Sequence, residues 1–120
     1  MTKGTPPRVP FARYKNVVLG ETYELSLVFI GIQRMRSLNK KYRNKDTATD
    51  ILSFPYSGKE GEIFLNLAEC KRSARLHNKD LVDFLAYIFI HGCLHLKGFS
   101  HGSTMEDAER RFIKRLHINY

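Results

Sequence analysis

An apolar stretch in the C-terminal third of the chain constrains the fold more than any other part of the sequence. Residues 81–97 are apolar on nearly every side, Asp80 is placed to cap their start, and Gly98 follows their end. A helix that is apolar all round is buried inside a protein. The sequence therefore predicts a central, buried helix against which the other elements pack.

Three histidines lie near the end of this predicted helix, in the pattern H-G-x-x-H-x-x-G-x-x-H. His91 and His95 are one helical turn apart, so they share a face. Gly98 favours a left-handed turn that ends the helix, after which the chain can bring His101 to the same point. Three converging imidazoles leave a tetrahedral zinc ion with a free fourth position, which is typical of a catalytic zinc site. We therefore predict that His91, His95 and His101 bind one Zn²⁺ ion.

The residue after the first histidine separates this chain from the metzincin peptidases. Those enzymes have the same histidine spacing, but with a glutamate that acts as general base at the position of Gly92. A small metallopeptidase is therefore the less favoured function, although metal binding is not affected. Cys93 is predicted to point to the opposite helix face and is excluded as a ligand. The alternative to a metal site is a pair of buried core histidines followed by a surface histidine.

The charge of the chain favours a polyanionic partner. It has 20 Lys and Arg residues against 12 Asp and Glu residues, a net charge of +8. The basic residues form three clusters: Arg34, Arg36, Lys40, Lys41, Arg43 and Lys45; Lys71, Arg72, Arg75 and Lys79; and Arg110, Arg111, Lys114 and Arg115. A solvated helix face explains any one cluster, but three together favour nucleic acid. No cluster is joined to an exposed apolar face of the kind that binds membranes.

Cysteine content and the start of the chain predict a cytoplasmic location. Cys70 and Cys93 provide no disulfide framework, and free thiols are typical of a reducing compartment. Residues 1–10 lack the apolar core of a secretory signal, and the longest apolar run, 84–90, is too short to span a bilayer.

The remaining pattern predicts an α+β fold in a single domain over residues 1–120, with a small mixed sheet of about four strands covered by helices. Strands are predicted at 24–30, 49–54 and 62–67, with a weaker one at 11–19; Pro55 ends the second, and 56–61 form a turn-rich connection. Helices are predicted at 33–43, at 81–97 and at about 104–116, the last with the start signal Ser103 and Glu106. A further helix is predicted to start at Asn66, which has Glu69 three residues later.

Two further segments accompany the histidine motif. Residues 38–46 are L-N-K-K-Y-R-N-K-D, residues 49–55 are T-D-I-L-S-F-P, and residues 61–63 are G-E-I. With the segment H-G-C-L-H-L-K-G-F-S-H, they resemble the YbeY family of bacterial metal-dependent endoribonucleases over roughly residues 24–116. Ser100 stands where that family usually has aspartate, Glu62 replaces another aspartate, and the chain is short at the N-terminus.

The resemblance implies an α+β fold, zinc on the three histidines and cleavage of single-stranded RNA. It also implies maturation of the 3′ end of small-subunit ribosomal RNA and ribosome quality control, with the small ribosomal subunit and assembly proteins as partners. Arg43 matches the arginine that the family places near the metal and needs for activity. From the residues alone, Arg43 would be an ordinary solvated charge at a helix end.

A non-catalytic, zinc-containing ribosome-assembly or RNA-binding factor is the main alternative to the nuclease. An open three-histidine site argues against it, because structural zinc sites usually have four protein ligands. Under the nuclease hypothesis, zinc activates a water near neutral pH, and the planar guanidinium of Arg43 donates hydrogen bonds to the phosphate. The aromatic residues Tyr42, Phe54, Tyr56 and Phe99 either stack on unpaired bases or belong to the core.

Overall fold

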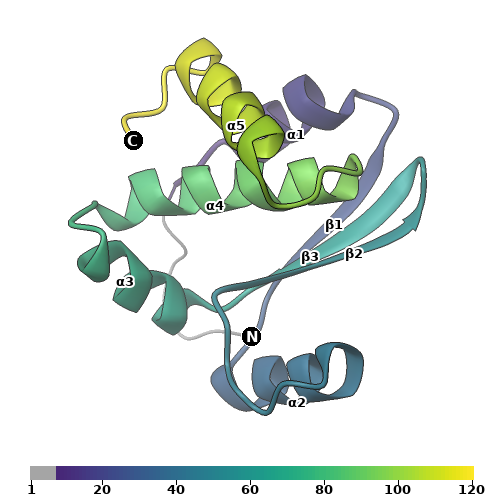
Figure 1. The fold of residues 1–120 in the computed structure, drawn as a ribbon, viewed down its shortest axis with the longest axis vertical. Coiled ribbons are helices and arrows are strands. Elements are labelled where there is room, and N and C mark those ends of the chain that lie inside the picture. Colours follow the sequence, from purple (N-terminus) through teal and green to yellow (C-terminus); the bar gives the residue numbers. More distant parts are fainter. Residues whose placement is uncertain (1–7) are drawn as a thin grey trace.

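The computed structural model describes residues 8–120, in which five helices and three strands follow one another along the chain (Figure 1). In order they are α1 (Phe11–Leu19), β1 (Glu24–Phe29), α2 (Ile32–Arg43), β2 (Ile51–Ser57), β3 (Glu60–Leu65), α3 (Leu67–Leu76), α4 (Leu81–Leu96) and α5 (Ser103–Arg115). Residues 1–7, most of the segment in which no secretory signal is predicted, lie outside the described residues. Every helix within residues 8–120 is too short or too polar to cross a lipid bilayer.

β3 is the middle strand of a three-stranded mixed sheet. It pairs in parallel with β1, where Leu27 lies opposite Ile63, and antiparallel with β2, where Ser53 lies opposite the same residue. The strand order is β1-β3-β2, so β1 and β2 form the two edges. The α+β class and the mixed sheet are as the sequence predicts.

Side chains of β3 alternate between two separate cores, because successive residues of a strand point to opposite faces. Ile63 and Leu65 are fully buried on the face covered by α4, and α1, α3 and α5 pack around that helix. Phe64 points to the other face and joins a smaller cluster with Met35 of α2. Figure 1 shows α4 on one side of the sheet and α2 on the other. α4 is the predicted central helix: ten of its 16 residues are buried.

The predicted strand at 11–19 is wrong, because this segment forms helix α1, and the sheet therefore has three strands instead of about four. Tyr14 and Val18 are its buried residues, and their spacing of four places them on one helical face. The ring of Phe11 packs edge-on against Phe89 of α4, with centroids 4.9 Å apart. Docking onto α4 therefore outweighs the strand propensity of residues 17–19, Val-Val-Leu, at the end of the segment.

The boundaries of the β2–β3 hairpin also differ from the prediction. β2 continues through Pro55 to Ser57, and β3 begins at Glu60, so the connection is much shorter than 56–61. β2 is an edge strand, where a proline is tolerated, and the register is irregular between Pro55 and Ser57. β3 ends at Leu65 instead of at residue 67, because Asn66 is the N-cap of α3 and Leu67 is its first helical residue.

The predicted start of α3 is confirmed by a side-chain cap. The side-chain oxygen of Asn66 accepts a hydrogen bond from the Glu69 backbone N–H at 2.8 Å, while its amide nitrogen donates to the Ile30 carbonyl at 2.9 Å. Asp80 occupies the N-cap position of α4, but its side chain makes no capping hydrogen bond. α5 differs slightly, because Gly102 occupies its cap position and Ser103 is already helical.

Candidate metal centre

The end of α4 and the turn after it bring His91, His95 and His101 together. Each ring offers one nitrogen, and these three atoms all lie within 4.8 Å of one another. The ring centroids are 4.7 Å apart for His91 and His95, 5.3 Å for His91 and His101, and 4.6 Å for His95 and His101. The convergence that the spacing predicts is therefore present in the fold.

A turn with Gly98 in a left-handed conformation makes this convergence possible. Its φ is 108°, a value that L side chains rarely adopt. The Gly98 N–H donates to the His95 carbonyl and the Phe99 N–H donates to the Leu94 carbonyl, both at 3.0 Å. These two bonds form the Schellman motif that ends many helices. The chain then reverses and carries His101 back toward α4.

Two of the three rings are held in a defined orientation by acceptors on their Nδ1 atoms. Nδ1 of His91 donates to the carboxylate of Glu109, and Nδ1 of His95 donates to the Phe99 carbonyl at 3.1 Å. With the protons on Nδ1, both Nε2 atoms carry lone pairs, and they face each other at 3.2 Å. Two such nitrogens cannot hydrogen-bond to each other, but both can bind one cation. The donor set thus fits a metal ion.

Burial keeps His95 in the form that metals bind. Burial of the ring, followed by the neighbouring His91, lowers the pKa of His95 below its usual value of 6.5. A histidine ligand must be neutral, because protonation removes the lone pair that the metal needs. His95 therefore remains a competent ligand at neutral pH.

Glu109 is the residue of this site that the sequence analysis does not identify. It lies on α5 and is only 6% exposed. Met105 and Ala108 are buried on one face of this helix, and Glu109 is buried with them on that face. An acidic residue within an apolar helix face is the signal that could have revealed it, because buried carboxylates need a partner.

Arg43 lies in the same groove as the histidines. The groove has a volume of about 790 Å³ and runs along β2, and it is lined by all three histidines together with Arg43 and Lys45. Nη2 of Arg43 donates to the Ser53 carbonyl at 2.9 Å, and the guanidinium lies 5.4 Å from the centroid of the Phe54 ring. The guanidinium of Arg43 is thus anchored to the edge strand β2.

The segment between α2 and β2 forms the other wall of this groove. Asn39 is buried and donates from its amide nitrogen to the Thr47 carbonyl at 2.9 Å. Arg36 and Asp46 form an ion pair with a nitrogen–oxygen distance of 2.7 Å. Asn44 ends α2 in a left-handed conformation with φ 57°, immediately after Arg43. Asn39, Arg43 and Lys45 of the 38–46 motif line the groove.

Gly92 is explained by close packing of α4 on the sheet. A Cβ atom at this position would lie 2.6 Å from Cδ1 of Ile51, 3.0 Å from Oγ of Ser53 and 3.2 Å from Cδ1 of Ile63. The larger glutamate of the metzincin motif does not fit there.

Cys93 is fully buried on another side of the helix, where burial raises the pKa of its thiol. The group that could hold a metal ion consists of His91, His95 and His101.

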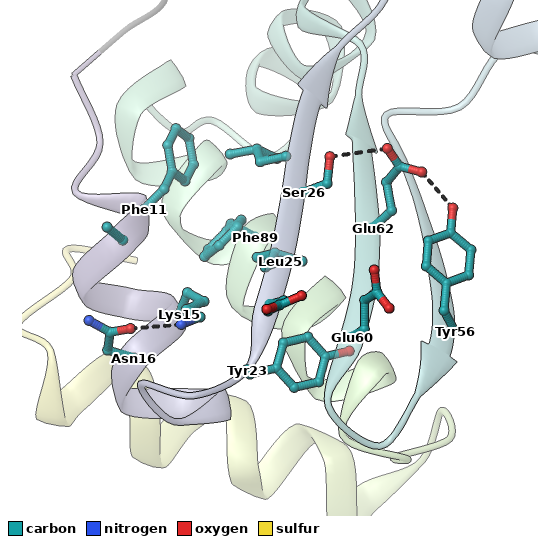
Figure 2. A pocket seen from close by; sticks show the side chains of 14 residues that line it. Phe11, Lys15, Asn16, Tyr23, Leu25, Ser26, Tyr56, Glu60, Glu62 and Phe89 are labelled. Atoms are coloured by element: carbon teal, nitrogen blue, oxygen red, sulfur yellow. Dashed lines mark hydrogen bonds between the residues drawn. The ribbon is translucent and has the colours of Figure 1, made fainter.

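A second cavity, of about 800 Å³, lies at the β1 edge of the sheet, between that strand and α1 (Figure 2). Figure 2 shows Glu62 between two donors: it accepts hydrogen bonds from Ser26 Oγ at 3.1 Å and from the Tyr56 hydroxyl. Gly61 packs against the Tyr23 hydroxyl and Leu96, which leaves no room for a side chain. Glu62 therefore lies outside the histidine groove, so the change from aspartate to Glu62 does not alter the metal centre directly.

The four aromatic residues predicted to stack on bases occupy different environments. Tyr42 and Tyr56 are 54% and 59% exposed. Phe54 packs edge-on against Tyr42 with centroids 5.3 Å apart. Tyr56 lies two residues further along the same strand, β2, where its hydroxyl donates to Glu62 and it contributes to the second cavity. Phe99 packs against the main core. Phe54 lies beside Arg43, and Tyr42 packs against Phe54.

Comparisons with known proteins agree with this architecture. Residues 11–118 match the model of a family described as Endoribonuclease YbeY. The endoribonuclease YbeY of Nitrosomonas eutropha is 37% identical over 119 residues, covering 92% of this chain and 84% of that protein. The one from Thermodesulfovibrio yellowstonii is 40% identical over 99 residues, covering 77% and 61%. The solution structure of TM1509 from Thermotoga maritima superposes with a TM-score of 0.63 at 21% identity, covering 88% of this chain and 78% of that one, and shares the fold.

Proposed function

The chain belongs to the YbeY endoribonuclease family, and we propose that it is a zinc-dependent endoribonuclease that cleaves single-stranded RNA. The groove that contains His91, His95, His101 and Arg43 would be its active site. The observation that carries the proposal is the convergence of three histidine nitrogens within 4.8 Å, in a groove that also contains an anchored arginine. Metal ligands and a phosphate-binding cation are the two components that metal-assisted phosphodiester cleavage requires.

The donor set supports zinc as the metal. Three imidazole nitrogens from the protein, with a fourth position left open, are the ligand set of catalytic zinc in several hydrolases. Bound there, zinc supplies a Lewis acid for a phosphate oxygen and makes water a nucleophile near neutral pH. The two Nδ1 hydrogen bonds of His91 and His95 support this assignment, because they leave both Nε2 atoms available.

Arg43 would bind the scissile phosphate. One of its five N–H donors is used by the Ser53 carbonyl, so the planar group is fixed while other donors remain for a ligand. A fixed guanidinium matches the geometry of phosphate oxygens better than a mobile ammonium. Lys45 lines the same groove and adds positive charge for the adjacent backbone phosphates.

Preference for unpaired RNA would come from Tyr42 and Phe54. Their rings contact each other beside Arg43, and Tyr42 leaves more than half of its surface exposed. A base can stack on such a ring only when it has left a duplex, and stacking is largely independent of base identity. These residues would therefore favour single-stranded over duplex RNA, with little preference for sequence.

We further propose, from the family and from the net charge of +8, that the RNA is small-subunit ribosomal RNA. The protein would take part in maturation of its 3′ end and in ribosome quality control in the cytoplasm, in contact with the small subunit and its assembly proteins. A strongly basic surface supports binding to such a polyanion.

The proposal is tested with purified zinc-loaded protein and the same protein treated with a chelator. Each is incubated with a defined unpaired RNA and with the duplex of the same sequence, and the products are mapped. Strand scission only with metal and only in the unpaired RNA is the expected result. RNA binding without scission in both preparations would support a non-catalytic assembly factor instead. A casein digest with the zinc-loaded protein tests the peptidase, which the packing at Gly92 already disfavours.

A further inference from the structure

We propose that Glu109 is a positioning residue of the metal centre: its carboxylate fixes the ring of His91 so that Nε2 faces His95 and His101. The metal role of these histidines is taken from the proposed function. The arrangement of Glu109, however, can be tested separately from RNA cleavage. No part of the sequence motif contains this residue, because it lies on the helix that follows.

The burial of Glu109 requires a specific partner. Its side chain lies on the face of α5 that packs against α4, where Met105 is 1% exposed and Ala108 is fully buried. A carboxylate in such surroundings is costly unless it is hydrogen-bonded or paired. The partner is Nδ1 of His91, on α4. The ring with which this carboxylate pairs also belongs to the metal-binding group.

The two ligands of α4 are oriented by different means. His95 is anchored by the Phe99 carbonyl, within the turn that ends its own helix. His91 is anchored by Glu109, which is 18 residues away in sequence and on a different helix. The orientation of His91 therefore depends on how α5 docks against α4. α5 in this way acts on the geometry of the metal centre without supplying a ligand.

A carboxylate on the distal nitrogen of a histidine ligand has known chemical consequences. It fixes the tautomer and the ring plane, and it makes the other nitrogen a better donor. Loss of such a partner typically weakens metal binding by about 10-fold to 100-fold. Without Glu109, His91 could carry its proton on Nε2, and that nitrogen would then no longer bind a metal.

The test measures zinc affinity of the full chain by competition with a chromophoric chelator. Glu109→Gln keeps the size of the side chain but replaces the carboxylate, and Glu109→Ala removes the acceptor. We expect Glu109→Gln to weaken zinc binding by about 10-fold to 100-fold and Glu109→Ala at least as much. Glu106→Gln is the matched control, because Glu106 is an exposed acid one turn earlier on the same helix, and its zinc affinity should equal that of the wild type.

Thermal unfolding without metal separates positioning from folding. Glu109→Gln should unfold close to the wild type while binding zinc more weakly, and saturating zinc should restore its cleavage rate. Wild-type zinc affinity in a folded Glu109→Gln variant would overturn the positioning role, whether or not the protein cleaves RNA. If the wild type binds zinc and Glu109→Gln binds it more weakly, but neither cleaves RNA, the positioning role holds and the proposed function fails.

Discussion

The Nε2 atoms of His91 and His95 face each other at 3.2 Å, and acceptors on both Nδ1 atoms prevent either ring from turning away. This geometry is unfavourable for two neutral rings, since neither can donate to the other. It becomes favourable when a cation lies between them, as at metal sites with several histidine ligands. The buried helix and its terminal turn therefore maintain a preformed site.

Replacing His95 with Ala should abolish zinc binding and RNA cleavage together, because two ligands hold the ion far more weakly than three. Zinc content after dialysis and cleavage of an unpaired RNA are the two measurements. His117→Ala is the control, since His117 is exposed and lies outside the metal-binding group. Cleavage by a zinc-free His95→Ala protein at the wild-type rate would contradict the metal-dependent mechanism.

Replacing Arg43 with Glu should leave zinc content unchanged and reduce kcat. Loss of a fixed donor to transition-state charge costs roughly 10²-fold to 10³-fold, and the reversed charge adds repulsion of the phosphate. Arg34→Glu on the same helix makes the same charge change at an exposed position outside the groove, and should retain most of the activity. Equal turnover for both variants would remove the role assigned to Arg43.

The sequence predicts those features that depend on local patterns. The buried helix and the spacing of His91, His95 and His101 lie within one short segment, and the left-handed turn needs only Gly98. The cap at Asn66 is similarly local. Each of these features involves residues close together in sequence, so periodicity and capping rules are sufficient to predict them.

The features that the sequence analysis misses depend on tertiary contacts. α1 contains the adjacent β-branched residues Val17 and Val18, which favour a strand, and its helical form depends on docking against α4. Glu109 finds its partner only when α5 folds back over α4. Gly92 marks the absence of a general base in the sequence, but its packing against Ile51 becomes visible only in the fold.

Replacing Gly92 with Ala should destabilise the protein by about 1–3 kcal/mol, because the new methyl group overpacks the junction between α4 and the sheet. Urea unfolding of metal-free protein measures this change. Gly58→Ala is the control, since a Cβ atom there meets nothing within 4 Å. A Gly92→Ala protein as stable as the control would show that the junction relaxes freely. Gly92→Glu should fold still less well and should not create a peptidase.

Stability should fall at alkaline pH, in part because of Cys70. Burial, followed by the charges of Asp50 and Glu69, raises the pKa of this thiol from 9.0 to about 12. Above about pH 9 the unfolded chain loses this proton while the folded protein keeps it, so folding becomes less favourable between the two values. The slope is at most about 1.4 kcal/mol per pH unit for one group. Urea midpoints at neutral pH and near pH 10 should therefore differ less for Cys70→Ala than for the wild type; equal differences would contradict this origin.

Replacing Tyr42 with Ala should raise KM for unpaired RNA and leave zinc content and kcat nearly unchanged. Stacking of one base on an aromatic ring is worth about 1–3 kcal/mol, which corresponds to a roughly 5-fold to 150-fold change in affinity. Tyr42→Trp should preserve binding, because the larger ring also stacks. Tyr56→Ala is the comparison variant: this tyrosine is similarly exposed on the same strand, but its hydroxyl donates to Glu62 and it lines the second cavity instead of packing on Phe54. If Tyr56→Ala raises KM as much as Tyr42→Ala does, the effect is not specific to the ring beside Arg43, and the base-stacking role assigned to Tyr42 is wrong.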